Sequence, residues 1–114
     1  MKIKLDIKPL SVNVAWQGRR FSTPAKKQYE EQVLLMLPKQ HIPGPYYRID
    51  YKFFLVNFKM TDQQNLLKCL TDCLVKRGII TDDRFIIDER IRKYPSAHDG
   101  IELEIEGIGL HEKN

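Results

Sequence analysis

The sequence predicts an α+β fold in which two helices pack on one small mixed sheet. Apolar residues alternate with charged ones near both ends of the chain, as in half-buried strands, whereas two internal segments repeat apolar residues at helical spacing. The chain has 114 residues, enough for one domain with its own core, so residues 1–114 are expected to form a single domain. The predicted order of elements is β-α-β-α-β-β.

The first predicted strand lies near the N-terminus, where Ile3, Leu5 and Ile7 alternate with charged residues until Pro9. From Pro9 to Phe21 this alternation disappears, and the segment is longer than most connections between elements. We therefore expect a polar, aromatic and basic loop of the kind that often carries function.

The first helix is expected to begin at Thr23 and Pro24, because a capping hydroxyl followed by proline is a typical helix start. Pro38 is expected to end this helix. A turn then leads into residues 46–56, which are rich in β-branched and aromatic side chains and too apolar on both faces for an exposed ribbon. This segment is predicted to be a central strand.

The second helix is predicted over residues 61–77, with Leu70 and Leu74 on its apolar stripe and Gly78 as its C-terminal stop. Residues 84–94 have an extended pattern, a turn follows at residues 95–100, and residues 101–106 alternate again. The last two extended segments are expected to pair with each other as a terminal antiparallel hairpin.

Charge and cysteine content narrow the class of protein. The formal charge of +4 favours polyanionic partners such as nucleic acid, and no apolar run approaches the roughly 20 residues of a spanning helix, so no membrane partner is expected. Cys69 and Cys73 share one face of the second helix and are predicted to be buried, protonated thiols. No second Cys/His pair has ligand spacing, which argues against structural zinc. We expect a soluble, unsecreted, cytoplasmic protein without a small-molecule cofactor.

Three aspartates could hold a divalent metal: Asp62, Asp82 and Asp83. Phosphodiester hydrolysis near neutral pH commonly uses Mg²⁺, a hard ion that takes oxygen ligands from one or two carboxylates. The same residues have an ordinary structural interpretation. An aspartate before a helix caps free N–H groups, and an aspartate pair in a turn bonds its own backbone. Spacing alone leaves both interpretations open.

The second helix and the turn after it carry a longer pattern: Asp62-x-x-Asn65-Leu66-x-Lys68, then Asp72, then Gly78-x-x-x-Asp82-Asp83. The opening loop carries another: Pro9-x-Ser11-x-Asn13 with Trp16 and Arg19-Arg20. Together these patterns resemble the signature of the RusA-type Holliday junction resolvases, and Lys93 falls where the late strand of that family carries a lysine. The resemblance covers nearly the whole chain.

The resemblance implies a small homodimeric, Mg²⁺-dependent endonuclease, encoded by a bacterium or a phage, that binds four-way DNA junctions and resolves them by symmetric paired nicks. Asp62 and Asp83 match two of the three metal-site aspartates of the family, and Lys68 matches its helix lysine. On spacing alone, Lys68 could instead form an ordinary surface ion pair with Asp72. With the resemblance, we expect Lys68 to neutralise charge that develops on the phosphoryl group.

Gln64 stands where the Asp-x-Asp-Asn motif of the family has its second aspartate. A glutamine oxygen can ligate a metal but brings no negative charge, so metal binding should weaken and activity could vanish. Three explanations stay open: a natural variant that uses Asp82 or another acid, a natural junction binder without cleavage, or a deliberate substitution. Gln64 could also form a capping box with Thr61.

Helix length leads to a prediction about dimerisation. If Asp62 begins the helix and Gly78 ends it, about sixteen residues at a rise of 1.5 Å separate them by roughly 24 Å. Asp83 would then lie far from Asp62 unless the chain folds sharply back or the partner subunit's Asp83 lies beside Asp62. We therefore expect composite sites at a homodimer interface.

The candidate DNA contacts combine basic residues with an aromatic that could stack on unpaired bases at a branch point, although a solvated surface would explain the same residues. They are Asn13, Trp16, Arg19, Arg20, Lys59 and Lys93, and the wider basic set adds Lys26, Lys27, Arg90 and Arg92. The leading hypothesis is a junction-resolving endonuclease impaired by Gln64. The alternatives are a non-catalytic branched-DNA-binding protein of the same fold and an interaction domain with a basic face.

Overall fold

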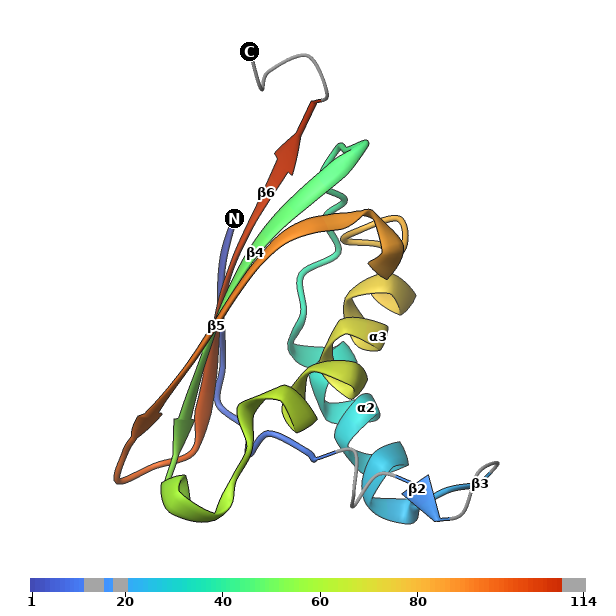
Figure 1. Ribbon diagram of the computed structural model, residues 1–114. Coiled ribbons are helices and arrows are strands. Elements are labelled where there is room, and N and C mark those ends of the chain that lie inside the picture. The colour runs from blue at the N-terminus through green and yellow to red at the C-terminus, as the bar shows by residue number, and fades with distance from the viewer. Residues whose placement is uncertain (12–15, 18–20, 110–114) are drawn as a thin grey trace.

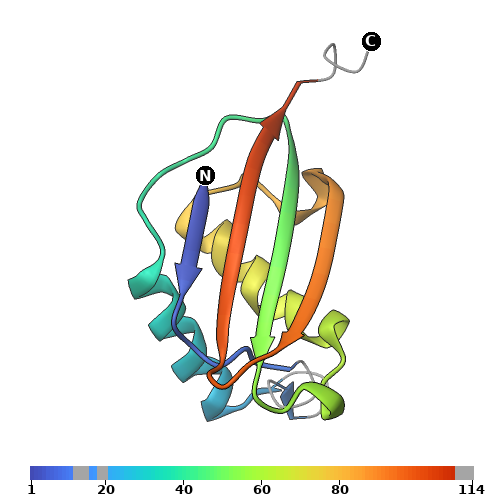
Figure 2. The ribbon, with the colours of Figure 1, turned by 90° about the vertical axis from the view of Figure 1, so that its left-hand side faces the viewer.

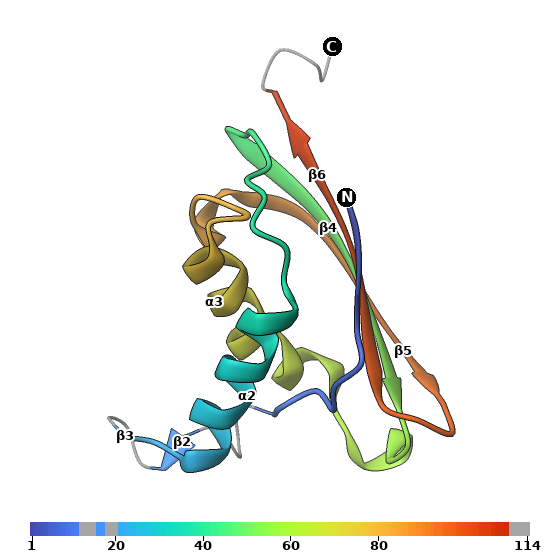
Figure 3. The same ribbon diagram turned by 180° about the vertical axis from the view of Figure 1, so that it is seen from behind.

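Two layers make up the described part of the chain in the computed structural model: a four-stranded sheet and two helices that cover one of its faces (Figures 1 and 3). The structure describes residues 1–11, 16–17 and 21–109, with the backbone alone for residues 16–17 and 21–22. This architecture confirms the predicted α+β class. No helix in these described ranges is long and apolar enough to cross a membrane.

The main sheet has the order β1-β6-β4-β5, in which β6 is antiparallel to both β1 and β4, and β5 is parallel to β4 (Figure 2). The strands span Lys2–Leu5 (β1), Tyr46–Leu55 (β4), Ile86–Pro95 (β5) and Gly100–Ile108 (β6). Two short strands, Trp16–Gln17 (β2) and Phe21–Ser22 (β3), pair with each other in a separate ribbon. The element order thus follows the predicted one, with this ribbon added between the first strand and the first helix.

The predicted terminal hairpin is wrong, because β4 lies between β5 and β6. The side chains of the two strands explain this placement. On the helix-facing side, β6 presents Ile101, Leu103 and Ile105, each at most 2% exposed, and such a strand is stabilised by neighbours on both sides. On the same side, β5 presents Glu89 and Lys93, which need solvent or polar partners, so β5 lies at the sheet edge.

The helices begin and end largely where the sequence indicates. Helix α2 spans Pro24–Met36, and the Thr23 hydroxyl accepts a hydrogen bond from Lys26 N at 3.2 Å, as expected for a capping residue before proline. Helix α3 spans Leu67–Arg77 and ends at Gly78, whose φ of 82° is the left-handed conformation that favours glycine. The chain before α3 forms 3₁₀ turns at Phe58–Met60 (η1) and Gln63–Leu66 (η2), so the α-helical part begins later than predicted.

The core fills the space between the helices and the sheet. Tyr47, Ile49, Tyr51 and Phe53 on the inner face of β4 are 0% exposed, and this confirms the prediction of a central strand. They belong to one apolar cluster with residues of both helices: Tyr29, Val33, Leu66, Leu70 and Leu74. The cluster also contains Cys69 and Cys73. Burial raises the pKa of both thiols, that of Cys73 to about 12, so they are protonated near neutral pH, as predicted.

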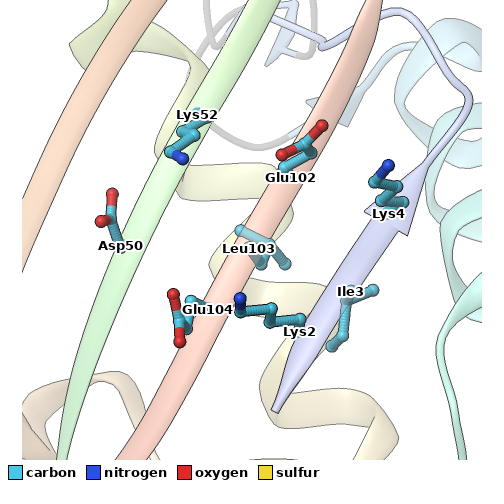
Figure 4. A pocket seen from close by; sticks show the side chains of 8 residues that line it. All are labelled: Lys2, Ile3, Lys4, Asp50, Lys52, Glu102, Leu103 and Glu104. Atoms are coloured by element: carbon cyan, nitrogen blue, oxygen red, sulfur yellow. The ribbon is translucent and has the colours of Figure 1, made fainter.

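The opposite face of the sheet, the open face, is not covered by the described helices (Figure 2). By the register of the strands, charged side chains of both signs lie on it. A hollow of about 110 Å³ lies on this face, and Figure 4 shows that positive and negative side chains from neighbouring strands are mixed in its lining. Its charged lining residues are Lys2, Lys4, Lys52, Asp50, Glu102 and Glu104. Mixed charge of this kind suits a hydrated surface rather than a polyanion.

Candidate functional site

A cleft of about 420 Å³ opens between helix α3 and the beginning of strand β5. One wall is formed by η2 and α3, and the other by β5 and the 3₁₀ turn Asp83–Phe85 (η3) that precedes it. The lining residues are Gln64, Leu67, Lys68, Thr71, Asp83, Arg84, Ile86 and Glu89. The cleft therefore collects three of the sequence-predicted site residues, Gln64, Lys68 and Asp83, from segments about twenty residues apart in the chain.

Gln64 reaches this cleft because Asp62, and not Thr61, caps the turn. Asp62 Oδ1 accepts a hydrogen bond from Gln64 N at 3.0 Å, while the Thr61 hydroxyl donates to Asn57 O at 2.9 Å. The capping box proposed for Thr61 and Gln64 is therefore wrong. Within the described part of the chain, the Gln64 side chain forms no hydrogen bond, so its amide faces the cleft without a structural role.

Lys93 fixes the segment that leads to Asp62. Its ammonium donates to Phe58 O at 3.1 Å and to Thr61 O at 2.7 Å, and it lies 4.4 Å from the centroid of the Phe58 ring. These contacts tie strand β5 to the backbone directly before the aspartate. Lys93 was predicted as a DNA contact, and its position gives it a further role as the anchor of the Asp62 loop.

Lys68 lies on the exposed side of α3 and forms an ion pair with Asp72 at 3.3 Å. The pair is the ordinary i,i+4 contact that the spacing allowed, and such exposed pairs contribute a few tenths of a kcal/mol. The Lys68 side chain is 57% exposed. It can leave Asp72 for a phosphate in the cleft at little cost.

The two adjacent aspartates of η3 have different surroundings. Asp82 Oδ1 accepts a hydrogen bond from Arg84 N at 3.2 Å, and Asp82 Oδ2 lies 3.6 Å from Arg84 Nε. The backbone N–H of Arg84, followed by the contact with Asp83, lowers the pKa of Asp82. Asp82 thus caps the turn, as the structural interpretation predicted, whereas Asp83 lines the cleft.

Helix α3 separates the two turns that carry the motif aspartates, η2 before it and η3 after it (Figure 1). Asp62 is not among the residues that line the cleft with Asp83. In the described ranges, no three His, Cys, Asp or Glu side chains come close enough to hold a metal ion together. The two aspartates are thus carried by turns at opposite ends of α3, and the composite site stays a prediction.

Glu89 is the cleft residue that the sequence analysis missed. The pairing of β5 with β4 skips Ile87, since Tyr47 lies opposite Ile86 and Arg48 opposite Asp88. This β-bulge shifts the alternation of the strand and turns Glu89 toward α3. Every second side chain of a strand lies on the same face. Alternation counted backward from the partly buried Ile91 would have placed Glu89 on the inner face, whereas alternation counted forward from Ile86 placed Asp88 there.

The floor of the cleft is polar where the two walls meet. The Tyr51 and Thr71 hydroxyls are hydrogen-bonded at 3.2 Å. Burial raises the pKa of the Tyr51 phenol, the Thr71 contact partly offsets this, and the nearby carboxylates of Glu89 and Asp83 raise it further.

Comparison with known protein families identifies the family of this chain. A family model described as Endodeoxyribonuclease RusA matches residues 11–106, which is most of the chain. The chain belongs to the RusA family. No curated protein gives a significant match. Family membership supports, in general terms, an endodeoxyribonuclease that resolves Holliday junctions, depends on a divalent metal and binds branched DNA.

The donor set of the RusA-family cleft fits a hard cation. Asp83 and Glu89 offer carboxylate oxygens and Gln64 offers an amide oxygen, while no cysteine or histidine is among the described residues that line the cleft. Mg²⁺ needs only one or two carboxylates because it keeps several waters and completes its shell with substrate phosphate oxygens. The residues therefore fit Mg²⁺ without a preformed cage of protein ligands.

The predicted DNA contacts of this RusA-family member are only partly covered by the structure. Asn13, Arg19 and Arg20 lie outside the described residues, as does the side chain of Trp16. Lys59 is exposed in η1, close in sequence to Asp62.

Of the wider basic set, Lys26 is a poor candidate for phosphate contact. It is 8% exposed and pairs with Glu30 at 2.8 Å. Arg92 pairs with Asp50 at 2.7 Å on the open face, away from the cleft.

Proposed function

We propose that this protein is a Mg²⁺-dependent, structure-specific endonuclease that binds four-way DNA junctions as a homodimer and resolves them by symmetric paired nicks. The observation that carries the proposal is the cleft, which gathers Gln64, Lys68 and Asp83 of the family motif on a surface open to a DNA strand. Membership of the RusA family supplies the reaction class and the branched substrate.

In this proposal, Asp62 and Asp83 hold the metal, and the Gln64 amide oxygen is a neutral additional ligand. When bound, Mg²⁺ polarises the phosphoryl oxygens and lowers the pKa of a coordinated water. Lys68 neutralises the charge that develops on the phosphate, with Asp72 as its partner in the free protein. Asp82 caps η3 and thereby positions Asp83, although its use as a ligand stays an untested prediction.

The proposal includes a composite site. Because Asp62 does not line the cleft with Asp83 in one chain, the partner subunit's Asp83 would complete the set around Asp62 across a two-fold axis. Two such sites related by the axis would account for symmetric nicks in two strands. Sedimentation of the free protein tests this part, since a monomer at micromolar concentration would contradict it.

DNA binding is proposed to use the basic and aromatic residues of the opening loop, Asn13, Trp16, Arg19 and Arg20, together with Lys59 and Lys93. If about six phosphates are contacted, affinity for the junction should fall by orders of magnitude between low and physiological salt. Gel-shift titrations at several salt concentrations measure that slope.

Gln64 favours a second candidate function, a junction-binding protein of the same fold that performs no chemistry. Replacing a carboxylate by an amide removes one unit of countercharge from the metal site. Binding of the junction does not require that charge. The two candidates therefore make the same prediction for DNA binding and opposite predictions for cleavage.

The experiment that separates them is cleavage of an end-labelled four-way junction in Mg²⁺ at low salt, comparing the natural chain with Gln64→Asp. Paired symmetric nicks by both chains would establish a resolvase that tolerates Gln64. Nicks from Gln64→Asp alone would identify the site and show that this chain is impaired. Folded protein that shifts the junction but nicks it in neither form would establish the binding-only function, and a linear duplex is the substrate control.

A further inference from the structure

Glu89 lies in the cleft beside the motif residues but belongs to neither the motif nor the predicted site. It stands on strand β5 opposite Ile49 of β4, on the side of the sheet that faces α3. Together with Asp83, it supplies the two carboxylates among the lining residues of the cleft. The cleft that lacks a charge at Gln64 therefore has one at Glu89.

The backbone shows that this orientation depends on a specific distortion. Strict alternation from Ile86 would turn Asp88 and Arg90 inward and Glu89 to the open face. The bulge at Ile87 reverses this phase, so that Asp88 faces outward, where it pairs with Arg48 at 2.8 Å. Bulges that re-aim a side chain are over-represented next to active sites.

Glu89 also differs in its surroundings from three of the carboxylates on the open face. Asp88, Asp50 and Glu106 each pair with an arginine at 2.9 Å or less. Across the described residues, Glu89 forms no ion pair, and its nearest polar neighbours include the Tyr51 phenol. An exposed carboxylate without an ion pair, in a cleft with Asp83, is accessible to a cation.

We infer that Glu89 is a metal-binding residue of the nuclease site and supplies the negative charge that Gln64 lacks. This inference rests on the proposed function, since it assigns a ligand to that same site. In the composite site proposed above, Glu89 and Asp83 of one protomer would join Asp62 of the partner subunit, so that three carboxylates surround the cation and one of them comes from the edge strand. The amide oxygen of Gln64 then remains as a neutral ligand.

Direct binding of Mn²⁺ to the full-length chain tests the inference independently of activity, with free Mn²⁺ measured by electron paramagnetic resonance. Glu89→Gln should weaken Mn²⁺ binding about tenfold or more, because affinity at such sites follows the number of charged ligands. Asp88→Asn is the matched control, one residue away on the open face, and should bind as the natural chain does. Equal binding by Glu89→Gln and the natural chain would overturn the inference.

A second substitution tests whether the two positions compensate. Gln64→Asp should strengthen Mn²⁺ binding, and the double variant Glu89→Gln/Gln64→Asp should return close to the natural affinity, since it has the same number of carboxylates. If the double variant binds as tightly as Gln64→Asp alone, Glu89 is not a ligand. Glu89→Asp, which keeps the charge, should retain more affinity than Glu89→Gln, and melting curves show that each chain is folded.

The same set distinguishes failure of the inference from failure of the proposed function. If Gln64→Asp binds Mn²⁺ and nicks the junction while the natural chain does neither, the nuclease site stands and compensation by Glu89 is wrong. If no chain, including Gln64→Asp, binds Mn²⁺ or nicks the junction, the proposed metal-dependent function and the inference both fail.

Discussion

The two faces of the sheet differ in the surroundings of their carboxylates. On the open face, Asp88 and Asp50 lie within 2.8 Å of arginine nitrogens, so their charges are neutralised within the protein. On the helix-facing side, Asp83 and Glu89 form no ion pair in the described part of the structure, and both line the cleft. Carboxylates without an ion pair at an open cleft are accessible to a cation or to a basic partner.

The lysines and arginines show the same contrast. Arg48 of the open face bridges Asp88 and Glu106, an exposed arrangement that links neighbouring strands. Lys93 on the inner side donates to two backbone carbonyls of the segment before Asp62. A basic side chain can therefore stabilise the fold on either face of the sheet, but of these two it is Lys93, on the inner side, that positions Asp62 of the proposed site.

The largest expected effect is on chemistry and compares Asp83 with Asp88. Asp83→Asn, made in the Gln64→Asp background, should reduce Mg²⁺-dependent cleavage of a four-way junction by about a hundredfold or more, because it removes a metal ligand worth several kcal/mol. Asp88→Asn in the same background should leave the rate nearly unchanged. Single-turnover kinetics measure both, and equal losses would contradict the distinction between the two faces.

A smaller effect is expected on stability and compares Lys93 with Arg90. Lys93→Met should lower the free energy of unfolding by about 1.5–3 kcal/mol, since it leaves two carbonyls without a charged donor. Arg90→Met on the open face should change it by no more than about 0.5 kcal/mol. Urea denaturation gives both values. A Lys93 variant as stable as the Arg90 variant would show that the loop before Asp62 does not depend on this anchor.

The smallest expected effect concerns pH and compares Glu30 with Glu106. Burial by itself would raise the pKa of Glu30, but hydrogen bonds from Lys26 and Lys76 more than offset this and lower it below 4.5. Because the folded-state pKa is the lower one, Glu30 stabilises the fold above pH 4.5, and this contribution is lost as the pH falls through the folded pKa.

Glu30→Gln should therefore reduce stability at pH 7 and flatten its decline between pH 5 and about pH 3. Glu106→Gln, at an exposed ion pair of the open face, should leave the pH profile nearly as it was. Thermal unfolding across this pH range is the measurement, and parallel profiles for the natural chain and Glu30→Gln would refute the assignment.

Much of the fold could be predicted from local sequence patterns. Thr23-Pro24 marks a helix start and Gly78 a helix end because capping and left-handed conformations depend on the nearest residues alone. The apolar alternation of residues 46–56 and 101–106 identified two strands correctly, since a strand buries alternate side chains. Strand pairing was mispredicted, because β5 and β6 follow one another in sequence but have unequal inner faces.

The residues of the candidate site likewise comprise some that the sequence pattern predicts and others that it does not. The motif from Asp62 to Asp83 is a contiguous pattern, so Gln64, Lys68 and Asp83 could be selected without coordinates. The capping role of Asp62 was one of the two interpretations that the sequence left open, because this contact is made with a residue two positions further on. The anchoring role of Lys93 and the orientation of Glu89 could not be predicted, because each depends on contacts between segments distant in the chain.

The sequence by itself determined the fold class, the family and the motif residues, because each of them follows from residue patterns within short segments of the chain. The tertiary structure alone decided that β4 lies between β5 and β6, and that Glu89 shares a cleft with Asp83. A single extra residue, Ile87, reverses the phase of a strand, and its effect on Glu89 exists only once β5 is paired with β4.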